Sequence, residues 1–347
     1  MLELRLCAYP LMLLAAGAGL LADERVVTST DELRAAFEAP DGRTIRLGPG
    51  TYTIDEPLAA RSANHANVVG SGWNTVVHRT GEGPAFLFAD AAFCTVSDLM
   101  VTGDGTASTG ILYSGQSSSN TVRYCRISGF AENGIRYDGQ AETPMSSNSV
   151  LFCHFIDNRV EQLRSFYNND FYIIGNQFGC WKQQPKTGAA LIHSSAGSYG
   201  LNYHWGNDVA MTLGPGSDYN RIENNRFEQS RTSGIIIGNP ETPDQWNRFN
   251  ILIGNTIHTN SEGNFREYSA VVAYDAHDTI FSGNQVFSWY PPTTQHKSAL
   301  VLGRGCQSWI VTGNILRHNA EEAIVAAPDA GHVIKDNLID TEPWGGK

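Results

Sequence analysis

A repeating pattern of apolar and polar positions runs through most of this 347-residue chain. Its frame is an apolar residue, two variable residues, a polar residue, one variable residue and a second apolar residue, as in Ile173, Asn176 and Phe178. Ten copies, 23 to 30 residues apart, place at the polar position Asp98, Cys125, Cys153, Asn176, Asn202, Asn225, Asn255, Asn284, Asn314 and Asn337. The copy at Asn202 departs from the frame because His204 replaces the second apolar residue. A repeat of this period predicts a solenoid.

A second series of short apolar segments follows many of these copies. Its members are rich in β-branched residues, are bounded by Gly, Asn or Asp, and lie at 110–113, 134–137, 234–237, 270–273, 299–302 and 323–326. Such segments predict strands rather than helices. Several short strands in each repeat, with no helical segment between them, predict a parallel β-helix.

The asparagine of the frame has a physical role in such a fold. Its side-chain amide both donates and accepts hydrogen bonds. Stacked asparagines can therefore bond to one another from coil to coil at the strand spacing of roughly 4.8 Å. Cysteine at the same position is a small buried residue that preserves the stack.

With this repeat, residues 45–340 resemble the right-handed parallel β-helix superfamily that has the pectate-lyase-like fold. The resemblance implies an all-β, single-stranded right-handed parallel β-helix, and the chain is long enough for about a dozen coils. The superfamily includes polysaccharide lyases, glycoside hydrolases, uronan epimerases, fructan-cleaving enzymes, phage tailspikes and adhesins. The polygalacturonase and pectate-lyase sequence signatures are absent from this chain, so the reaction has to be inferred from clusters of residues.

The chain divides into a leader, a cap and one solenoid domain. Residues 1–22 combine Arg5, an apolar run and a small residue before Asp23, which predicts a cleaved secretory signal. The alternative, an uncleaved membrane anchor, needs a longer apolar run. Residues 23–44 precede the coils, and a capping box predicts a short helix at 30–38 that covers the first coil. Residues 45–347 form the β-helix domain, and we expect a secreted or periplasmic protein.

Composition restricts the possible partners. The net charge of −11 argues against nucleic acid. The same negative charge means that an anionic polysaccharide would need local basic residues or bridging Ca²⁺ to bind. A turn-rich protein can supply the oxygen ligands of Ca²⁺, but the metal is unknown and no cofactor is certain. Outside the leader five cysteines remain, and no pair has metal-site spacing, so buried free thiols are favoured over disulfides.

Charged residues of the second strand series form the first candidate site. Consecutive coils supply Arg136 and Asp138, then Glu161 and Arg164, then His193, with Lys182, Lys186 and Asp208 beside them. Arg and Lys can neutralise a uronate carboxylate, and His or Lys can take the proton α to it. The pattern predicts a lyase with His193 or Lys186 as base and with Arg136 and Arg164 on the carboxylate.

Two other interpretations of these charges stay open. Asp138 and Glu161, on neighbouring coils, could serve as the paired carboxylates of a glycoside hydrolase. The charges could also form a salt-bridged, solvated face of a non-catalytic glycan-binding or structural β-helix.

A second candidate site follows the strand at 270–274. Its Asp275, Ala276, His277 and Asp278 resemble the Asp-Pro-His-Glu/Asp signature of alginate C5-epimerases. Ala276 replaces the proline, and Val272 stands where that signature has a tyrosine. Because Asp and His are also ordinary turn residues, an unspecialised turn is the alternative.

Aromatic residues gather near the middle coils, where they could stack on sugar rings. Tyr203, Trp205, Trp246 and Tyr268, together with Asp275 and His277, are the predicted substrate-binding residues, and burial of some of them in the core is the alternative. Long connections at 141–147, 182–187, 240–246, 261–268 and 288–297 are expected to wall the glycan site. We therefore expect an exported protein that acts on a polysaccharide, most simply a uronan lyase.

Overall fold

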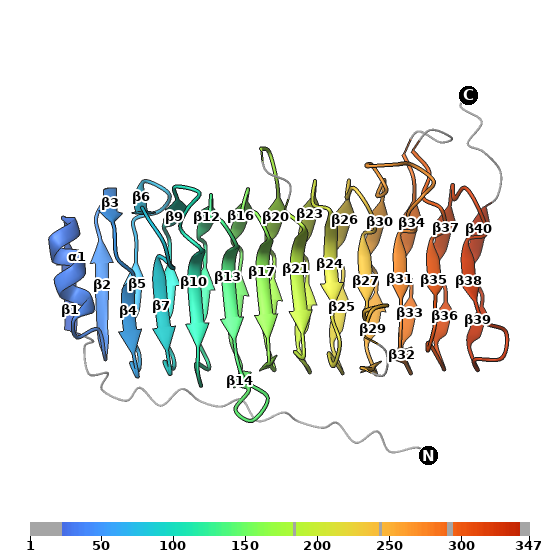
Figure 1. The fold of residues 1–347 in the computed structure, drawn as a ribbon, viewed down its shortest axis with the longest axis horizontal. Helices are drawn as coiled ribbons and strands as arrows, with labels where there is room; N and C mark the ends of the chain where they lie inside the picture. The colour runs from blue at the N-terminus through green and yellow to red at the C-terminus, as the bar shows by residue number, and fades with distance from the viewer. Residues whose placement is uncertain (1–22, 183–184, 243–244, 290–293, 341–347) are drawn as a thin grey trace, which may run out of the picture.

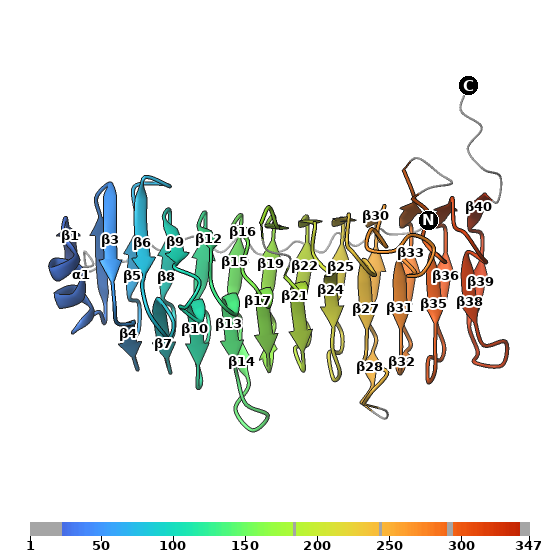
Figure 2. The ribbon, with the colours of Figure 1, turned by 45° about the horizontal axis from the view of Figure 1, so that its top comes forward.

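The chain forms a straight solenoid of about eleven coils in a computed structural model that describes residues 23–182, 185–242, 245–289 and 294–340. One short helix covers its N-terminal end (Figures 1 and 2). The predicted signal at 1–22 lies outside the described residues. No helix of the described part of the chain is long and apolar enough to cross a membrane.

Three parallel sheets run the length of the solenoid, and we name them A, B and C. Sheet A has thirteen strands, in spatial order β1 (Asp23–Val27), β2 (Arg43–Leu47), β5 (Asn67–Val69), β8 (Thr95–Ser97), β11 (Thr121–Arg123), β15 (Ser149–Leu151), β19 (Tyr172–Ile174), β22 (Ser198–Gly200), β25 (Arg221–Glu223), β29 (Ile251–Ile253), β33 (Ile280–Ser282), β36 (Ile310–Thr312) and β39 (Val333–Lys335).

Sheet B has twelve strands, β3 (Gly50–Ile54), β6 (Thr75–Arg79), β9 (Met100–Gly103), β12 (Arg126–Ser128), β16 (His154–Ile156), β20 (Gln177–Gly179), β23 (Tyr203–Trp205), β26 (Arg226–Glu228), β30 (Thr256–His258), β34 (Gln285–Phe287), β37 (Ile315–Arg317) and β40 (Leu338–Asp340).

Sheet C has eleven strands, β4 (Leu58–Arg61), β7 (Phe86–Ala89), β10 (Thr109–Ser114), β13 (Asn133–Asp138), β17 (Glu161–Phe166), β21 (Thr187–Ile192), β24 (Val209–Leu213), β27 (Ile235–Ile237), β31 (Val271–Ala273), β35 (Leu300–Leu302) and β38 (Ile324–Ala326). Two small pairs, β14 (Met145–Ser146) with β18 (Asn168–Asn169) and β28 (Asn247–Arg248) with β32 (Ala276–His277), complete the strands.

Each coil passes from sheet C to sheet A, then to sheet B, and back to sheet C of the next coil. We call the three connections the C–A, A–B and B–C corners. Every neighbouring pair within a sheet is parallel and in register, for example Ile135 of β13 with Leu163 of β17. Side chains therefore alternate between the core and one of three outer faces, and each outer face carries residues in rows along the solenoid. The predicted parallel β-helix is confirmed.

The predicted asparagine ladder occupies the A–B corner. Asn255, for example, donates from Nδ2 to Oδ1 of Asn284 on the next coil (3.0 Å) and to the carbonyl oxygen of Ile222 (2.9 Å). Its Oδ1 accepts from both the backbone N and Nδ2 of Asn225 (3.0 Å each). The same bonds link Asn176, Asn202, Asn225, Asn255, Asn284, Asn314 and Asn337.

One member of the predicted ladder is wrong. Residue-by-residue pairing aligns Val122 with Val96 and Ile127 with Val101, so the position of Cys125 falls on Leu99 rather than on Asp98. Leu99 is fully buried, and Asp98 takes the left-handed turn conformation (φ 58°) that precedes the ladder position. Cys125 and Cys153 do fill the ladder position, and both are buried free thiols.

A shorter polar stack, which the sequence analysis does not predict, lies at the C–A corner. Asn120 donates to Oδ1 of Asn148 (3.1 Å), and the backbone N of Asn220 donates to Oδ1 of Asn250 (2.9 Å). Asn220 and Asn250 stand five residues before Asn225 and Asn255, so the sequence does contain the signal for it.

The N-terminal end is closed as predicted. Helix α1 (Thr30–Phe37) starts at the capping box of Ser29 and Glu32 and buries Leu33, Ala36 and Phe37 against the first coil. Strand β1 is an addition to the prediction, because it pairs with β2 and extends sheet A by one strand beneath the helix.

Replacing Asn255 by Ala should lower the free energy of unfolding by about 3 kcal/mol, because the change removes the acceptor of the buried Asn225 backbone N and the side-chain donor to the Ile222 carbonyl. Chemical denaturation of the variant, compared with Gln285→Ala on the exposed face of sheet B, measures the effect. Equal stability of the two variants would contradict a supporting role for the ladder.

Candidate active site

The outer face of sheet C carries the residues predicted to react with substrate. In β13 the side chains of Ile135 and Tyr137 are buried, whereas Arg136 and Asp138 point outward. In β17 the outward residues are Arg164 and Phe166. The strand pairing sets Arg136 directly beside Arg164.

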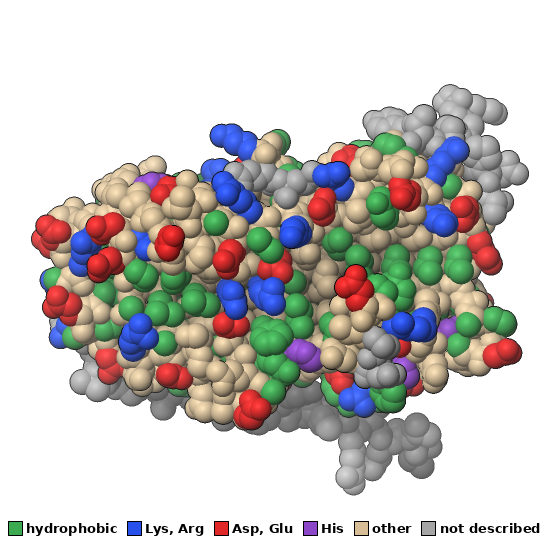
Figure 3. All heavy atoms as spheres, viewed as in Figure 1, with side chains coloured by type: hydrophobic (Ala, Val, Ile, Leu, Met, Phe, Trp, Pro, Cys, Tyr) green, Lys and Arg blue, Asp and Glu red, His purple; other side chains and the backbone are tan. Residues whose placement is uncertain are grey.

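This arginine pair interrupts an otherwise uncharged row of outward residues. The row consists of Leu87, Leu112, Arg136, Arg164, Ala190, Thr212, Ile236, Val272, Val301 and Val325, paired in that order from β7 to β38. Figure 3 shows hydrophobic side chains on both sides of a charged group near the middle of this face. Two like charges in directly opposed positions of a sheet are unfavourable unless other groups compensate them, so their placement requires an explanation.

Three carboxylates partly compensate the arginines. Arg136 Nη2 donates to Asp138 (3.0 Å), and its Nη1 lies 3.8 Å from Glu132. Arg164 Nη1 donates to Glu161 Oε1 (3.2 Å), and Glu161 Oε2 accepts from the Asn133 amide (2.5 Å). Both arginine side chains remain about one-third exposed at 32%, so the carboxylates fix the guanidinium groups without covering them.

An imidazole lies at the C–A corner below the arginines. His193 directly follows β21, in the left-handed conformation (φ 48°), and its ring stacks on Tyr167 (centroids 4.6 Å apart, planes 7° apart). Phe166 meets the His193 ring edge-on at 5.7 Å, and Arg164 lies 5.9 Å above the Phe166 ring. Partial burial lowers the pKa of His193 from its ordinary value. Its imidazole is therefore neutral, and can accept a proton, at neutral pH.

Phe166 and Tyr167 complete this group, although the sequence analysis did not single them out. Their signal is a pair of adjacent aromatic residues at the end of a strand, with Phe166 in register with Asp138. We call Arg136, Asp138, Arg164, Tyr167 and His193 the sheet C site.

The predicted cluster is larger than the group that the structure brings together. Lys186 precedes β21 whereas His193 follows it, so the two lie at opposite edges of sheet C, roughly 23 Å apart along the strand. Lys182 and Asp208 lie at the edge where Lys186 lies, the B–C corner. Lys186 therefore cannot act on the same sugar as His193, and the prediction that all these charges share one patch is wrong.

The predicted carboxylate pair is also separated. Glu161 pairs with Asn133, whereas Asp138 pairs with Phe166, five positions further along. This offset is about 16 Å along the strand, well beyond the roughly 5–10 Å between the carboxyl groups of glycosidases. Glu161 is also nearly buried, at 8% exposed, and its two oxygens are bonded to Asn133 and Arg164. The geometry gives no support to the hydrolase pair.

Long connections border sheet C on both edges. Those from β13 to β14 and from β27 to β28 leave its C–A edge, and those from β20 to β21, β30 to β31 and β34 to β35 enter at its B–C edge. The sheet C site thus lies on an outer face whose two edges carry these connections. Two hollows lie elsewhere, in the last coils, and neither includes the sheet C site. One is lined by Gly303, Arg304, Asp329 and their neighbours, and the other by Asn319, Ile324 and their neighbours.

The second predicted cluster lies further along the C–A corner. Asp275 is 5% exposed and accepts from Arg304 Nη2 (2.9 Å), and His277 stacks on Trp246 (centroids 5.0 Å). These contacts account for Asp275 as the anchor of a turn. Tyr268 lies at the other edge, in the connection from β30 to β31. The predicted substrate-binding residues therefore do not line a single surface.

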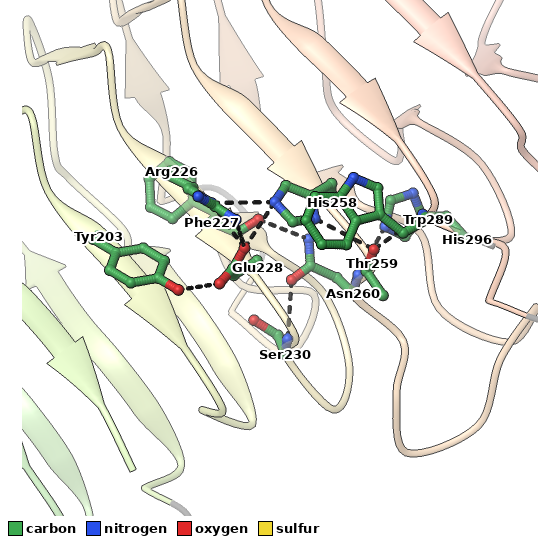
Figure 4. Close-up of polar contacts among 10 residues, drawn as sticks. All are labelled: Tyr203, Arg226, Phe227, Glu228, Ser230, His258, Thr259, Asn260, Trp289 and His296. Carbon is green, nitrogen blue, oxygen red and sulfur yellow. Dashed lines mark hydrogen bonds and ion pairs between the residues drawn. The ribbon is translucent and has the colours of Figure 1, made fainter.

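Tyr203 and Trp205 occupy yet another face, that of sheet B. Both are outward residues of β23, in register with Arg226 and Glu228 of β26. The Tyr203 hydroxyl donates to Glu228, whose carboxylate also accepts from Arg226 and lies 2.8 Å from His258 Nε2 (Figure 4). Arg226, Glu228 and His258 are not among the site residues predicted from the sequence. They flank the second apolar position of the repeat, where outward residues of sheet B must fall.

No group of three or more His, Cys, Asp or Glu side chains within the described ranges is arranged to hold a metal ion. The possible Ca²⁺ ion therefore has no assigned ligands in this part of the chain.

Comparisons with known proteins agree with the fold. Residues 200–345 match the family model of the right handed beta helix region. No curated protein sequence matches the chain. Among solved structures, the A-module of mannuronan C-5 epimerase AlgE4 from Azotobacter vinelandii superimposes with a TM-score of 0.72 at 15% identity, covering 90% of this chain and 95% of that one.

Two further solved structures have the same architecture. Alginate lyase from Paenibacillus sp. gives a TM-score of 0.57 at 12% identity, covering 91% of this chain and 99% of that one. DFA-IIIase from Arthrobacter chlorophenolicus gives 0.56 at 13% identity, covering 91% and 94%. At these identities the likeness demonstrates the fold alone.

Replacing Gly216 by Ala should displace the His193 ring. A Cβ at this position would lie 2.3 Å from His193 Nδ1, so we expect the imidazole to move toward solvent and its pKa to rise toward the ordinary value near 6.5. Titration of the histidine signals by NMR measures the shift. Gly283→Ala is the matched control, because Gly283 has a similar φ of 64° but open space around it. An unchanged His193 titration in Gly216→Ala would contradict the geometry of the site.

Proposed function

We propose that this protein is a lyase that cleaves a uronic-acid-containing polysaccharide by β-elimination on the outer face of sheet C. The observation that carries the proposal is the arginine pair, Arg136 and Arg164, fixed side by side in an otherwise uncharged row. The ring of Phe166, 5.9 Å from the Arg164 guanidinium and 5.7 Å from the His193 ring, links this pair to a neutral imidazole at the end of the next strand. An arginine pair on an open face suits a carboxylate ligand, because guanidinium groups bind carboxylates with directed hydrogen bonds.

Each group has a role in that reaction. The arginines neutralise the uronate carboxylate, which makes the proton on the adjacent carbon more acidic and stabilises the charge that develops when it leaves. His193 takes this proton. The electrons form the new double bond as the bond to the leaving oxygen breaks, and the Tyr167 phenol, stacked on His193, supplies a proton to that oxygen. Asp138 holds Arg136 in place.

The structural neighbours support this class of substrate. Two of the neighbours are a mannuronan C-5 epimerase and an alginate lyase, and the β-helix face suits a long polymer. Epimerisation would begin with the same proton transfer, and it differs only in that the sugar is reprotonated instead of cleaved. Formation of unsaturated ends distinguishes the two reactions.

Replacing His193 or Arg164 by Ala should reduce the rate of product formation by about 100-fold or more, because each change removes a group that acts on the reacting carbon. Ultraviolet absorbance of unsaturated uronyl ends, measured with alginate, pectate, hyaluronan and chondroitin, follows the reaction. Lys186→Ala is the control, since Lys186 lies at the opposite edge of sheet C.

The Lys186→Ala and His193→Ala variants distinguish between the two candidate bases. Loss of activity in Lys186→Ala with normal activity in His193→Ala would overturn the assignment of the sheet C site. Reducing sugar released without unsaturated ends would replace the lyase by a hydrolase, and no product from any of the four glycans would favour a non-catalytic glycan-binding protein.

The reaction should depend on pH through His193. Partial burial lowers the pKa of this imidazole, and the base must be neutral to accept a proton. The imidazole is therefore mostly neutral above the ordinary histidine pKa near 6.5, and activity falls as the pH drops through the lower pKa of the folded protein. The pH profile of kcat/KM should show an acid limb with a midpoint below about 6.5. A midpoint above that value would argue against His193 as the base.

A further inference from the structure

Sheet B has its own cluster of aromatic and charged residues, separate from the sheet C site. Tyr203 and Trp205 face outward from β23, and the two sheets form different sides of the solenoid. A sugar chain on the sheet C site therefore does not reach Tyr203 along the same face. These residues need an explanation of their own.

The Trp205 indole lies over the backbone of the preceding coil. A Cβ built on Gly179, its partner in β20, would come within 2.1 to 2.5 Å of three indole atoms. Glycine at this position thus lets the ring cover the sheet. Trp181 meets the Trp205 ring at 4.5 Å in a T-shaped contact and is itself 74% exposed. Burial in the core explains neither ring.

A hydrogen-bonded network fixes the polar groups beside these rings. Glu228 is 5% exposed and is bonded to Tyr203, Arg226 and His258 (Figure 4). Burial alone would raise its pKa, but the hydrogen bonds from His258 and Tyr203 outweigh burial and lower the pKa to about 2. Burial and the bond to Glu228 raise the pKa of Tyr203 to about 12. The carboxylate therefore stays ionised and the phenol stays protonated at neutral pH.

The network is held from the next coils by stacked rings. The His258 ring stacks on both Phe287 and Trp289 of the next coil, with ring centroids 5.0 Å from each. The Arg226 guanidinium lies 5.2 Å above the Tyr203 ring, and its side chain is 47% exposed. Because Glu228 uses its oxygens within the protein, the cluster presents fixed rings and a cation to solvent rather than a reactive carboxylate.

We propose that this surface of sheet B, formed by Trp181, Tyr203, Trp205 and Arg226, is a second, non-catalytic binding site for a polysaccharide. Sugar rings stack on the indoles, and Arg226 favours an acidic sugar or a hydroxyl group beside them. The rings and the guanidinium are held before the ligand arrives, so little side-chain entropy is lost on binding. The assignment does not depend on lyase activity at the sheet C site.

Affinity electrophoresis in gels that contain alginate, pectate, hyaluronan or neutral xylan tests the proposal. The wild-type protein should be retarded by at least one acidic polymer. Trp205→Ala should raise the dissociation constant for that polymer by about 10-fold or more. Tyr172→Ala is the matched control, because Tyr172 is a half-exposed aromatic residue on sheet A. Its mobility should equal that of the wild type.

Two further variants make the result decisive. Trp181→Ala should also weaken retardation, and because Trp181 is mostly exposed, this change answers the question even if Trp205→Ala fails to fold. Arg164→Ala should remain retarded although its rate of product formation is strongly reduced, which separates the second site from the sheet C site. Lack of retardation of the wild type in all four gels, or equal retardation of the wild type and the tryptophan variants, would overturn the proposal.

Discussion

The hydrogen bonds between stacked asparagine amides are the interaction on which the rest of this structure depends. Each ladder asparagine before the last, Asn337, bonds both to the next asparagine and to a backbone carbonyl of the coil before it. These bonds satisfy buried polar groups at the A–B corner, and they form only when neighbouring coils keep one strand spacing. A repeat of 23 to 30 residues can therefore vary in its other two corners while the three sheets stay in register.

Strict register determines where chemistry can occur. Outward residues of successive coils form rows, so two side chains lie side by side only if they occupy the same position of the repeat. Arg136 and Arg164 meet this condition, and Lys186 and His193, separated by the length of β21, do not. The same geometry gives the solenoid three separate faces. It leads us to assign proton transfer to sheet C and polymer binding without reaction to sheet B.

Much of the fold follows from the sequence because the repeat is strong and local. The asparagine spacing predicted the ladder from Cys125 onward, and Ser29 with Glu32 predicted the helix that caps it. The error at Asp98 arose where the asparagine is missing, since Asp98 and Leu99 fit the spacing almost equally well and only burial and φ separate them.

The site was harder to predict than the fold, because the corners vary in length and the register across them cannot be counted from one sequence. Arg226, Glu228 and His258 flank the second apolar position of the repeat, and the alternation of inward and outward side chains along a strand could have identified them. The stacking of Tyr167 on His193 depends instead on a turn conformation that the sequence does not specify.

The most direct test of the account is a crystal structure of the inactive His193→Ala variant with a uronic-acid oligosaccharide from the polymer that it binds. The account predicts one sugar carboxylate within hydrogen-bonding distance of both Arg136 and Arg164, with the carbon next to it facing the vacated position of His193. A sugar chain bound to sheet C with its carboxylates directed away from both arginines, or a chain bound only to sheet B, would contradict the assignment of the reaction to sheet C.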